Sequence, residues 1–484
     1  MSAEVRALEP KALWNHFSDL NAVPRPSKKE ERVIQFMVDF GKSLGLETAT
    51  DAIKNIIIKK PATKGMEDRQ TVILQSHVDM VHQKNNATTF DFETEGIKML
   101  VDGDFVKADG TTLGADNGIG VASIMALLSS TDIAHPALEA MFTVDEETGM
   151  TGAMELDPSF YEGTILLNLD TEDDDELSIG CAGGIDTNTT YTCSEIDTPM
   201  NVVSFKLEVN GLMGGHSGMD IDKGRGNANK LMNRILFDAP CEIFIHEING
   251  GGLRNAIPRE SWVVVSVKAD DVTVFEKYLN ECQSTFSAEL KAVEKNLNVG
   301  HQVVDTPKKC LSSVDAKKVV RSIYSLPNGV FKMSLDFQDL VETSSSLAQV
   351  VVKNGVFETK SLQRSSIEST KTDVANAIRS TFEMIGADVE QTGDYPGWEP
   401  NPDSAILKTM ANLYRKLYKE EPQIKACHAG LECGILGKHL PHVDMISFGP
   451  NIRHAHSPDE CTQISSVQKF WSFLLEVLKD TPKK

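Results

Sequence analysis

Three short, continuously apolar segments, each followed closely by His or Asp, constrain the fold of this chain most strongly. The segments and the polar residues that follow them are 72–74 with His77, 140–144 with Asp145, and 165–169 with Asp170. Runs of this kind are typical of strands that are buried on both faces of a sheet. A glycine-rich turn at 114–118 and an apolar helical stretch at 119–128 lie between the first two runs. This alternation predicts an α/β fold with a mostly parallel sheet covered by helices.

The hydrophobic pattern changes after about residue 184. Apolar and polar residues alternate over 203–209, which indicates an antiparallel strand with one solvent-facing side. Helical spacing of apolar residues follows at 272–293, and Asn354-Gly355 predicts a hairpin turn. An apolar run at 445–448 is then typical of one more strand of the first sheet. We therefore expect a discontinuous domain of residues 1–184 and 396–484, interrupted by an inserted α+β domain of residues 185–395.

Charge and cysteine usage exclude several classes of protein. The 484 residues carry a formal net charge of −22, from 48 Lys and Arg against 70 Asp and Glu, which argues against a nucleic acid or an anionic membrane as partner. The eight cysteines include no C-x-x-C pair and indicate thiols in a reducing compartment. The longest apolar stretch, 119–128, is shorter than the roughly 18 residues that a membrane span needs. We expect a cytoplasmic protein.

The polar residues near the predicted strand ends are imidazoles and carboxylates without a thiolate. The set comprises His77, Asp79, Asp116, Glu146, Glu147, Asp170, His454 and His456. Ligands of open α/β sheets bind outside the carboxyl ends of the strands, and adjacent carboxylates such as Glu146 and Glu147 repel each other unless a cation is present. Taken singly, Asp116 is equally compatible with a helix N-cap, and His77 with a packed imidazole. Taken together, the set predicts a catalytic site for Zn²⁺, Mn²⁺ or Co²⁺.

Several of these residues lie in longer motifs, which are Ser76-His77-Val78-Asp79-Met80, Leu113-Gly114-Ala115-Asp116-Asn117-Gly118, Asp145-Glu146-Glu147-Thr148-Gly149, Asn168-Leu169-Asp170 and Gly214-Gly215-His216-Ser217-Gly218. These motifs resemble the dizinc metallopeptidases of the aminoacylase and carboxypeptidase G2-like family. Further segments are similar to the bacterial aminoacyl-histidine dipeptidases, among them 180–186, 254–259 and 428–434. The resemblance extends over nearly the whole chain. It implies a catalytic domain that binds metal and an inserted lid domain.

The resemblance also implies a role for each residue of the metal centre. His77 and Asp170 would hold one zinc ion, Glu147 and His456 would hold the other, and Asp116 would bridge the two. Glu146 would act as the general base, and Asp79 would orient His77. Two zinc ions per subunit are therefore expected, with cobalt or manganese as substitutes. A bridging carboxylate fits the separation of about 3.5 to 4 Å that two-metal hydrolases use.

In the inserted domain, the resemblance implies that His216 stabilises the developing oxyanion of the scissile carbonyl. Asn255 and Arg364 would bind the carboxylate end of the substrate, and Gly430 would let the substrate approach the backbone closely. Without the resemblance, His216 and Gly430 would be read as turn residues and Arg364 as an ordinary strand arginine. The implied activity is hydrolysis of unblocked dipeptides, preferentially Xaa-His including β-alanyl-histidine, by a homodimer.

Two histidines depart from the family pattern, and other functions remain open at this point. His82 stands where relatives commonly have proline, and His454 precedes His456 by two positions. The segment 215–218 is followed by Met219, so it is not a G-x-S-x-G nucleophile elbow. The alternatives are a deacylase or tripeptidase on the same scaffold, or a peptide-binding module without catalysis.

Overall fold

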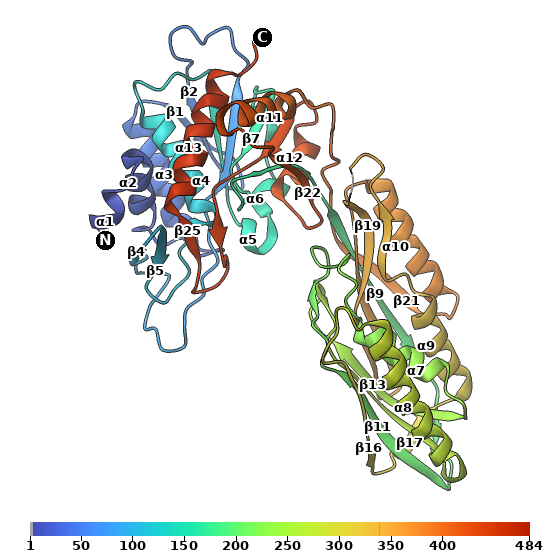
Figure 1. The fold of residues 1–484 in the computed structure, drawn as a ribbon. Helices are drawn as coiled ribbons and strands as arrows, with labels where there is room; N and C mark the ends of the chain where they lie inside the picture. Colours follow the sequence, from blue (N-terminus) through green and yellow to red (C-terminus); the bar gives the residue numbers. More distant parts are fainter. Residues whose placement is uncertain (1–2, 338) are drawn as a thin grey trace. The chain divides into compact units, whose positions relative to one another are not determined.

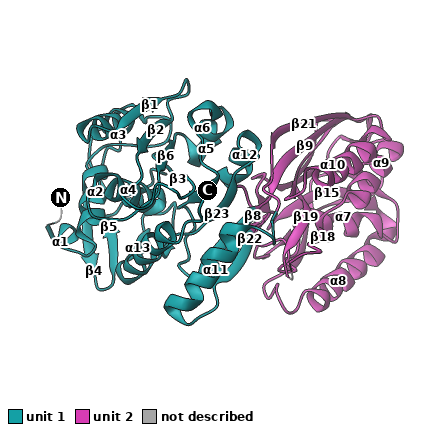
Figure 2. Ribbon diagram, turned by 90° about the horizontal axis from the view of Figure 1, so that it is seen from above, with its two compact units in different colours: residues 1–180, 400–426, 431–484 teal, residues 181–399, 427–430 magenta. Residues whose placement is uncertain are grey.

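The computed structural model describes residues 3–337 and 339–484, which form two compact units (Figures 1 and 2). The first unit comprises residues 1–180, 400–426 and 431–484, and the second comprises 181–399 and 427–430. The divisions at 180/181 and 399/400 lie beside the boundaries expected from the sequence. Residues 427–430 differ, because we expected them in the first domain. They belong to the second unit because the backbone N–H of Ala182 donates to the carbonyls of Cys427 and Ala429.

The first unit is built on an eight-stranded sheet with the order β1-β2-β6-β3-β7-β23-β8-β22. The strands are β1 (Glu47–Thr50), β2 (Ile56–Lys60), β3 (Val72–His77), β6 (Leu138–Thr143), β7 (Ile165–Asn168), β8 (Glu176–Cys181), β22 (Gln423–Cys427) and β23 (Asp444–Ser447). The four central strands β6, β3, β7 and β23 are parallel and fully or largely buried, as their continuous apolar runs predict. Towards the edges, β1, β2 and β8 pair in antiparallel fashion. The α/β expectation is confirmed, with a parallel centre inside a mixed sheet.

Helices and a small second sheet complete the first unit. The helices are α1 (Ala3–Arg6), α2 (Lys11–Leu20), α3 (Glu31–Ser43), α4 (Ala115–Ser129), α5 (Glu146–Gly149), α6 (Thr151–Met154), α11 (Ala405–Tyr418), α12 (Glu432–His439) and α13 (Ile464–Lys479). The second sheet has the order β24-β25-β5-β4, from Ile452–Arg453, Cys461–Gln463, Phe105–Ala108 and Met99–Asp102. Helix α4 is buried along almost its whole length because it packs between α2 and β3. This packing brings the first turn of α4 beside the end of β3.

The second unit contains one large antiparallel sheet with the order β16-β11-β15-β13-β19-β20-β9-β21, and β18 pairs with β19. The strands are β9 (Gly183–Thr192), β11 (Val202–Asn210), β13 (Ile243–Gly251), β15 (Ser261–Lys268), β16 (Asn298–Val304), β18 (Gly329–Met333), β19 (Val341–Lys353), β20 (Val356–Ser365) and β21 (Asp388–Tyr395). Short strands form two further pairs, β10 (Glu195–Asp197) with β17 (Lys309–Leu311) and β12 (Gly215–His216) with β14 (Ala256–Ile257). The predicted hairpin turn is confirmed, since Asn354 and Gly355 both have positive φ between β19 and β20.

Four helices share one hydrophobic core with this sheet (Figure 1). They are α7 (Ala228–Phe237), α8 (Val272–Glu289), α9 (Ser313–Ser325) and α10 (Glu368–Glu383). The core takes alternate residues of the strands, such as Phe205, Leu207 and Val209 of β11, which explains the alternation seen in the sequence. In neither unit do the described residues include a helix that is both long and apolar enough to cross a membrane.

Candidate metal centre

Asp116 lies between two imidazoles in the first unit. Its Oδ1 is 3.2 Å from Nε2 of His77, and its Oδ2 is 3.2 Å from Nε2 of His456. His77 ends β3, Asp116 lies in the non-helical first turn of α4, and His456 lies between β24 and β25. Segments that are far apart in the sequence therefore place one carboxylate between two ring nitrogens, as expected of a bridging ligand.

A second carboxylate completes the surroundings of each imidazole. Asp170, which follows β7, places Oδ1 3.5 Å from His77 Nε2, and Glu147 of α5 places Oε2 3.0 Å from His456 Nε2. We call His77, Asp116 and Asp170 the first triad, and Asp116, Glu147 and His456 the second triad. Within each triad, ligand atoms lie within 4.8 Å of one another. All five residues were predicted as metal ligands, and the fold brings them together around Asp116.

The electrostatics of the two triads favour bound positive charge. Hydrogen bonds to Asp116 and Glu147 raise the pKa of His456 to about 11. Burial opposes the charged form of His77, but the carboxylates of Asp170 and Asp116 outweigh burial and hold its pKa well above the ordinary value. Burial likewise opposes ionisation of Asp116, yet contacts with the two imidazoles hold the pKa of that carboxyl below its usual range. The cluster thus stabilises cations at the positions that its nitrogen and oxygen atoms surround.

Divalent cations fit this arrangement. Oε1 of Glu147 is buried and has no hydrogen-bond partner among the described residues, although the other oxygen of the same carboxylate contacts His456. An unpartnered buried carboxylate oxygen is costly, and a cation beside it removes that cost. The donor set of imidazole nitrogens and carboxylate oxygens is also the set that Zn²⁺, Mn²⁺ and Co²⁺ accept.

Glu146, which the sequence predicts as the general base, lies beside both triads. With His77 and Glu147 it forms another group whose ligand atoms lie within 4.8 Å of one another. Burial raises the pKa of Glu146 well above its ordinary value, and the nearby negative charges of Asp170 and Glu432 add to that effect. A general base at neutral pH needs a carboxyl whose pKa is raised in this direction, and neighbouring cations would favour its ionised form.

Asp79 contacts both His77 and the first residues of α5. Its Oδ1 lies 3.3 Å from Nδ1 of His77, on the side of the ring opposite Asp116. The same carboxylate accepts the backbone N–H groups of Glu146 at 3.0 Å and Glu147 at 3.3 Å, and the hydroxyl of Ser27 at 2.8 Å. Asp79 is fully buried, so these contacts hold it in one position. It can therefore orient His77 and fix the start of α5 at the same time.

The residues predicted to contact substrate lie in the second unit. Nδ1 of His216 accepts the backbone N–H groups of Gly218 and Met219, at 3.2 and 3.0 Å. In the neutral ring the proton is therefore on Nε2, which leaves that nitrogen as a donor. Burial, followed by the charge of Arg364, lowers the pKa of His216 and favours this neutral form. Nη2 of Arg364 lies 3.5 Å from His216 Nε2.

The other predicted contact residues flank His216 and Arg364. The carbonyl of Asn255 accepts the backbone N–H of Ser217 at 2.8 Å, where β12 pairs with β14. Gly430 belongs to the short segment 427–430, and the carbonyl of His428 lies so close to Gly218 that a Cβ there would be 2.0 Å away. Guanidinium, imidazole and backbone groups thus converge within the second unit, as donors suited to a carboxylate or a carbonyl oxygen.

Sequence reasoning did not find several residues that build the site. Tyr395 accepts a hydrogen bond from Arg364 Nη1 at 3.0 Å, and Glu432 is a buried carboxylate that accepts from Gln75 at 2.7 Å. Arg25 and Glu460 hold the backbone of the loop that carries Asp116. Of these residues, only Glu460 could have been indicated by the sequence, because it ends the run His456-Ser457-Pro458-Asp459-Glu460. The two histidines that depart from the family pattern, His82 and His454, belong to neither triad.

Known proteins are similar to this chain in sequence and in fold. Residues 73–480 match the family described as Peptidase family M20/M25/M40. The chain is 41% identical over its whole length to the whole of the cytosol non-specific dipeptidase of Escherichia coli (strain K12). The crystal structure of aminoacylhistidine dipeptidase from Vibrio alginolyticus superposes with a TM-score of 0.94 at 40% identity, covering 100% of this chain and 99% of that one.

A more distant structure shares the fold. Aminopeptidase PepT from Bacillus cereus superposes with a TM-score of 0.56 at 15% identity, over 98% of this chain and 99% of that one. The resemblance indicated by the sequence motifs is confirmed by the full-length matches. Because the matched segment also makes up most of the sequence, this chain belongs to peptidase family M20/M25/M40.

Proposed function

We propose that the chain is a metal-dependent dipeptidase that hydrolyses the peptide bond of unblocked dipeptides, preferentially Xaa-His including β-alanyl-histidine. The observation that carries the proposal is the position of Asp116 between the imidazoles of His77 and His456, with the half-buried Glu146 beside them. The names of the full-length relatives, a non-specific dipeptidase and an aminoacylhistidine dipeptidase, support dipeptides as substrates. The preference for histidine rests on the second name and on the sequence motifs.

The first and second triads would each hold one divalent cation, with Asp116 shared between them. We propose zinc for both, with cobalt or manganese as substitutes, because the donors are imidazoles and carboxylates. Such ions would supply Lewis-acid activation of the attacking water and of the scissile carbonyl. The chain's own contribution would be a base from the first unit, and an oxyanion donor and a carboxylate clamp from the second.

Glu146 would move the proton. Its carboxylate takes a proton from the attacking water and later transfers it to the nitrogen of the leaving amino acid. Asp79 keeps His77 in one orientation and holds the N–H groups of residues 146 and 147, so the base stays in place. His216 would donate Nε2–H to the developing oxyanion. Arg364 and Asn255 would bind the C-terminal carboxylate, and Gly430 would leave room for the substrate backbone.

The test is hydrolysis of a substrate panel by protein stripped with a chelator and then reloaded with Zn²⁺. The panel contains β-alanyl-His, Gly-His, Leu-Gly, a tripeptide and an N-acetyl amino acid. Glu146→Gln is measured in parallel with Glu155→Gln, which changes an exposed carboxylate. We expect metal-dependent cleavage of the dipeptides, fastest for those ending in His. The Glu146 variant should lose about 10²- to 10⁴-fold in kcat while binding the same amount of zinc.

Other outcomes would select among the alternatives. Cleavage of the tripeptide or the N-acetyl compound alone would keep the centre and replace the substrate class. Two bound zinc ions without turnover of any compound would indicate a peptide-binding module.

The cytosolic name of the Escherichia coli relative supports a cytoplasmic location. Sedimentation of the purified chain would test the homodimer.

A further inference from the structure

We infer that two buried residues of opposite charge, Glu460 and Arg25, are positioning residues that each assemble one triad. Glu460 would fix the second triad and Arg25 the first, and both would act on the loop that carries Asp116. Neither residue offers an atom to the triads, so each would act through metal affinity, and more strongly at one site than at the other. This inference rests on the proposed two-cation function.

Glu460 binds four consecutive backbone N–H groups. Oε2 accepts from Leu113 at 2.7 Å and from Gly114 at 2.9 Å, and Oε1 accepts from Ala115 at 2.7 Å and from Asp116 at 3.3 Å. The residue is 2% exposed. A single carboxylate thus accepts the N–H groups of residues 113–116, where α4 begins, and fixes the backbone of Asp116.

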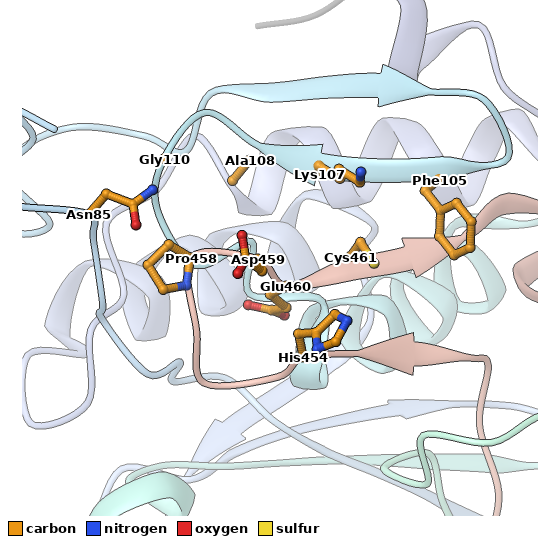
Figure 3. Close-up of a pocket in the computed structure, with 10 residues that line it drawn as sticks. All are labelled: Asn85, Phe105, Lys107, Ala108, Gly110, His454, Pro458, Asp459, Glu460 and Cys461. Carbon is orange, nitrogen blue, oxygen red and sulfur yellow. The ribbon is translucent and has the colours of Figure 1, made fainter. Parts of the chain in front are cut away.

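The position of Glu460 in the chain connects this turn to the second triad. Glu460 follows His456 by four residues, on the segment that leads from β24 to β25. Figure 3 shows this segment, with His454 and Glu460 among the residues that line a pocket. The Glu460 carboxylate is occupied by the backbone of 113–116, so it is not free to bind a ligand in that pocket. Its hydrogen bonds instead tie the loop of His456 to the loop of Asp116.

Arg25 makes the corresponding connection for the first triad. Nη1 donates to the carbonyls of Val78 at 3.1 Å and Asp79 at 2.9 Å, immediately after His77. Nη2 donates to the carbonyl of Gly114 at 2.6 Å, two residues before Asp116. The planar guanidinium therefore joins the end of β3 to the loop of Asp116, and its fork geometry cannot be reproduced by an ammonium group.

Two glycines make room for this guanidinium. A Cβ at Gly114 would lie 2.5 Å from Arg25 Nη2, and a Cβ at Gly118 would lie 2.7 Å from the same atom. Gly114 also has a φ of 69°, in the left-handed region that glycine adopts most easily. The glycines of the Gly114-Ala115-Asp116-Asn117-Gly118 motif are therefore explained by Arg25 as well as by the turn itself.

The two connections should affect the two sites unequally. Without Glu460, both Asp116 and the loop of His456 lose an anchor, whereas His77 and Asp170 remain at the ends of buried strands β3 and β7. Without the fork of Arg25, the end of β3 and the loop of Asp116 lose their connection, whereas Glu460 still joins that loop to His456. Substitution of residues that support metal ligands commonly costs about 10- to 100-fold in metal affinity.

The experiment measures zinc binding rather than turnover. Full-length variants are stripped with a chelator and equilibrated in Zn²⁺ buffers of fixed free concentration, and the bound metal is counted. Glu460→Gln should weaken one ion by about 10- to 100-fold and the other by a smaller factor, and Arg25→Lys should weaken the two ions in the opposite order. The matched controls, Asp459→Asn and Arg32→Lys, alter exposed neighbours and should leave both affinities unchanged.

Double variants identify which site each residue serves. In a His456→Ala background, which disables the second triad, Arg25→Lys should weaken the remaining ion more than Glu460→Gln does. In a His77→Ala background the pattern should be reversed. Equal weakening of both ions by Glu460→Gln, or no weakening of either, would overturn the inference.

Failure of the inference can be distinguished from failure of the proposed function. If His77→Ala and His456→Ala do not each remove one ion, the two-cation function itself is wrong. If they do, only the assignments of Glu460 and Arg25 are at stake. Thermal unfolding of the stripped proteins shows whether each variant folds. If Glu460→Gln does not fold, Glu460→Asp keeps the charge on a shorter side chain and should weaken the same ion by a smaller factor.

Discussion

Nδ1 of His77 lies 3.3 Å from Oδ1 of Asp79, and both side chains are almost fully buried. The opposite ring nitrogen faces Asp116 and Asp170. The same carboxylate accepts the backbone N–H groups of Glu146 and Glu147 and the hydroxyl of Ser27. The carboxylate of Asp79 therefore contacts the imidazole of His77 and also holds the backbone of Glu146 and Glu147.

Asp79→Asn should weaken both metal binding and catalysis. An amide has nearly the same shape, but its NH₂ group cannot accept the N–H groups of α5 and it favours the imidazole less strongly. We expect kcat/KM to fall about 10- to 100-fold with weaker zinc binding. Steady-state kinetics and metal analysis would measure the two effects. Asp102→Asn, an exposed carboxylate paired with Lys107, serves as the control, and an equal loss there would refute the prediction.

Arg364→Lys should act on substrate binding more than on the chemical step. The guanidinium of Arg364 is buried and donates to Tyr395, which leaves its fork available to a carboxylate in one orientation. Loss of a charge-assisted bidentate contact, worth about 1.5 to 3 kcal/mol, should raise KM about 10- to 150-fold. Arg379→Lys, a half-buried arginine of α10, is the control. Dipeptide amides lack the carboxylate, so a comparable loss on amides would contradict the proposed role.

Gly118→Ala should destabilise the protein although the position is helical. Alanine normally favours a helix over glycine by about 1 kcal/mol. Here the added Cβ would lie 2.7 Å from Arg25 Nη2 and 2.8 Å from Phe17 Cε2, so overpacking of about 1 to 3 kcal/mol should dominate. Urea unfolding would measure the change. Gly437→Ala in α12 is the matched control, because its Cβ would meet only the flexible end of Met445. Equal effects would show that crowding is not the cause.

Local patterns in the sequence were sufficient to predict much of the fold. The buried runs became β3, β6 and β7, and Asn354-Gly355 became the turn of a hairpin, because burial and turn chemistry depend on neighbouring residues. The antiparallel pairing of β1 and β2 was not predicted, since strand direction depends on how the whole sheet assembles. The same limit explains segment 427–430, which joins the second unit through hydrogen bonds from residue 182, far away in the chain.

The residues of the candidate site likewise fall into those that the sequence predicted and those that it did not. His77 and Asp170 could be placed near each other because neighbouring parallel strands end at one edge of a sheet. His454 and His456 joined the predicted set because they follow the late apolar run, and only the family resemblance favoured His456 over His454 as a ligand. Arg25 carries no local signal at all, since its importance arises from carbonyl groups that only the folded chain brings around it. Residues that support ligands through backbone contacts are therefore harder to predict than the ligands.

His428 should make the protein less stable in acid. Its imidazole is buried, lies 2.7 Å from the hydroxyl of Ser344, and has its pKa lowered to about 3 by burial, with the charge of Arg364 adding to the effect. In the unfolded chain the pKa is about 6.5. Between these values the unfolded state binds a proton that the folded state does not, so the free energy of unfolding decreases as pH falls below 6.5. The slope contributed by this residue approaches about 1.4 kcal/mol per pH unit.

His428→Gln should remove that contribution, because the amide can still bond to Ser344 but does not titrate. We expect the free energy of unfolding of the variant, measured by urea denaturation of metal-free protein between pH 7 and pH 5, to decrease less on acidification than that of the unmodified chain. Comparison at each pH cancels the contributions of other titrating groups. His442→Gln changes an exposed histidine and should leave the acid slope unaltered. Identical slopes for His428→Gln and the unmodified chain would mean that folding does not lower the pKa of His428, and would refute the prediction.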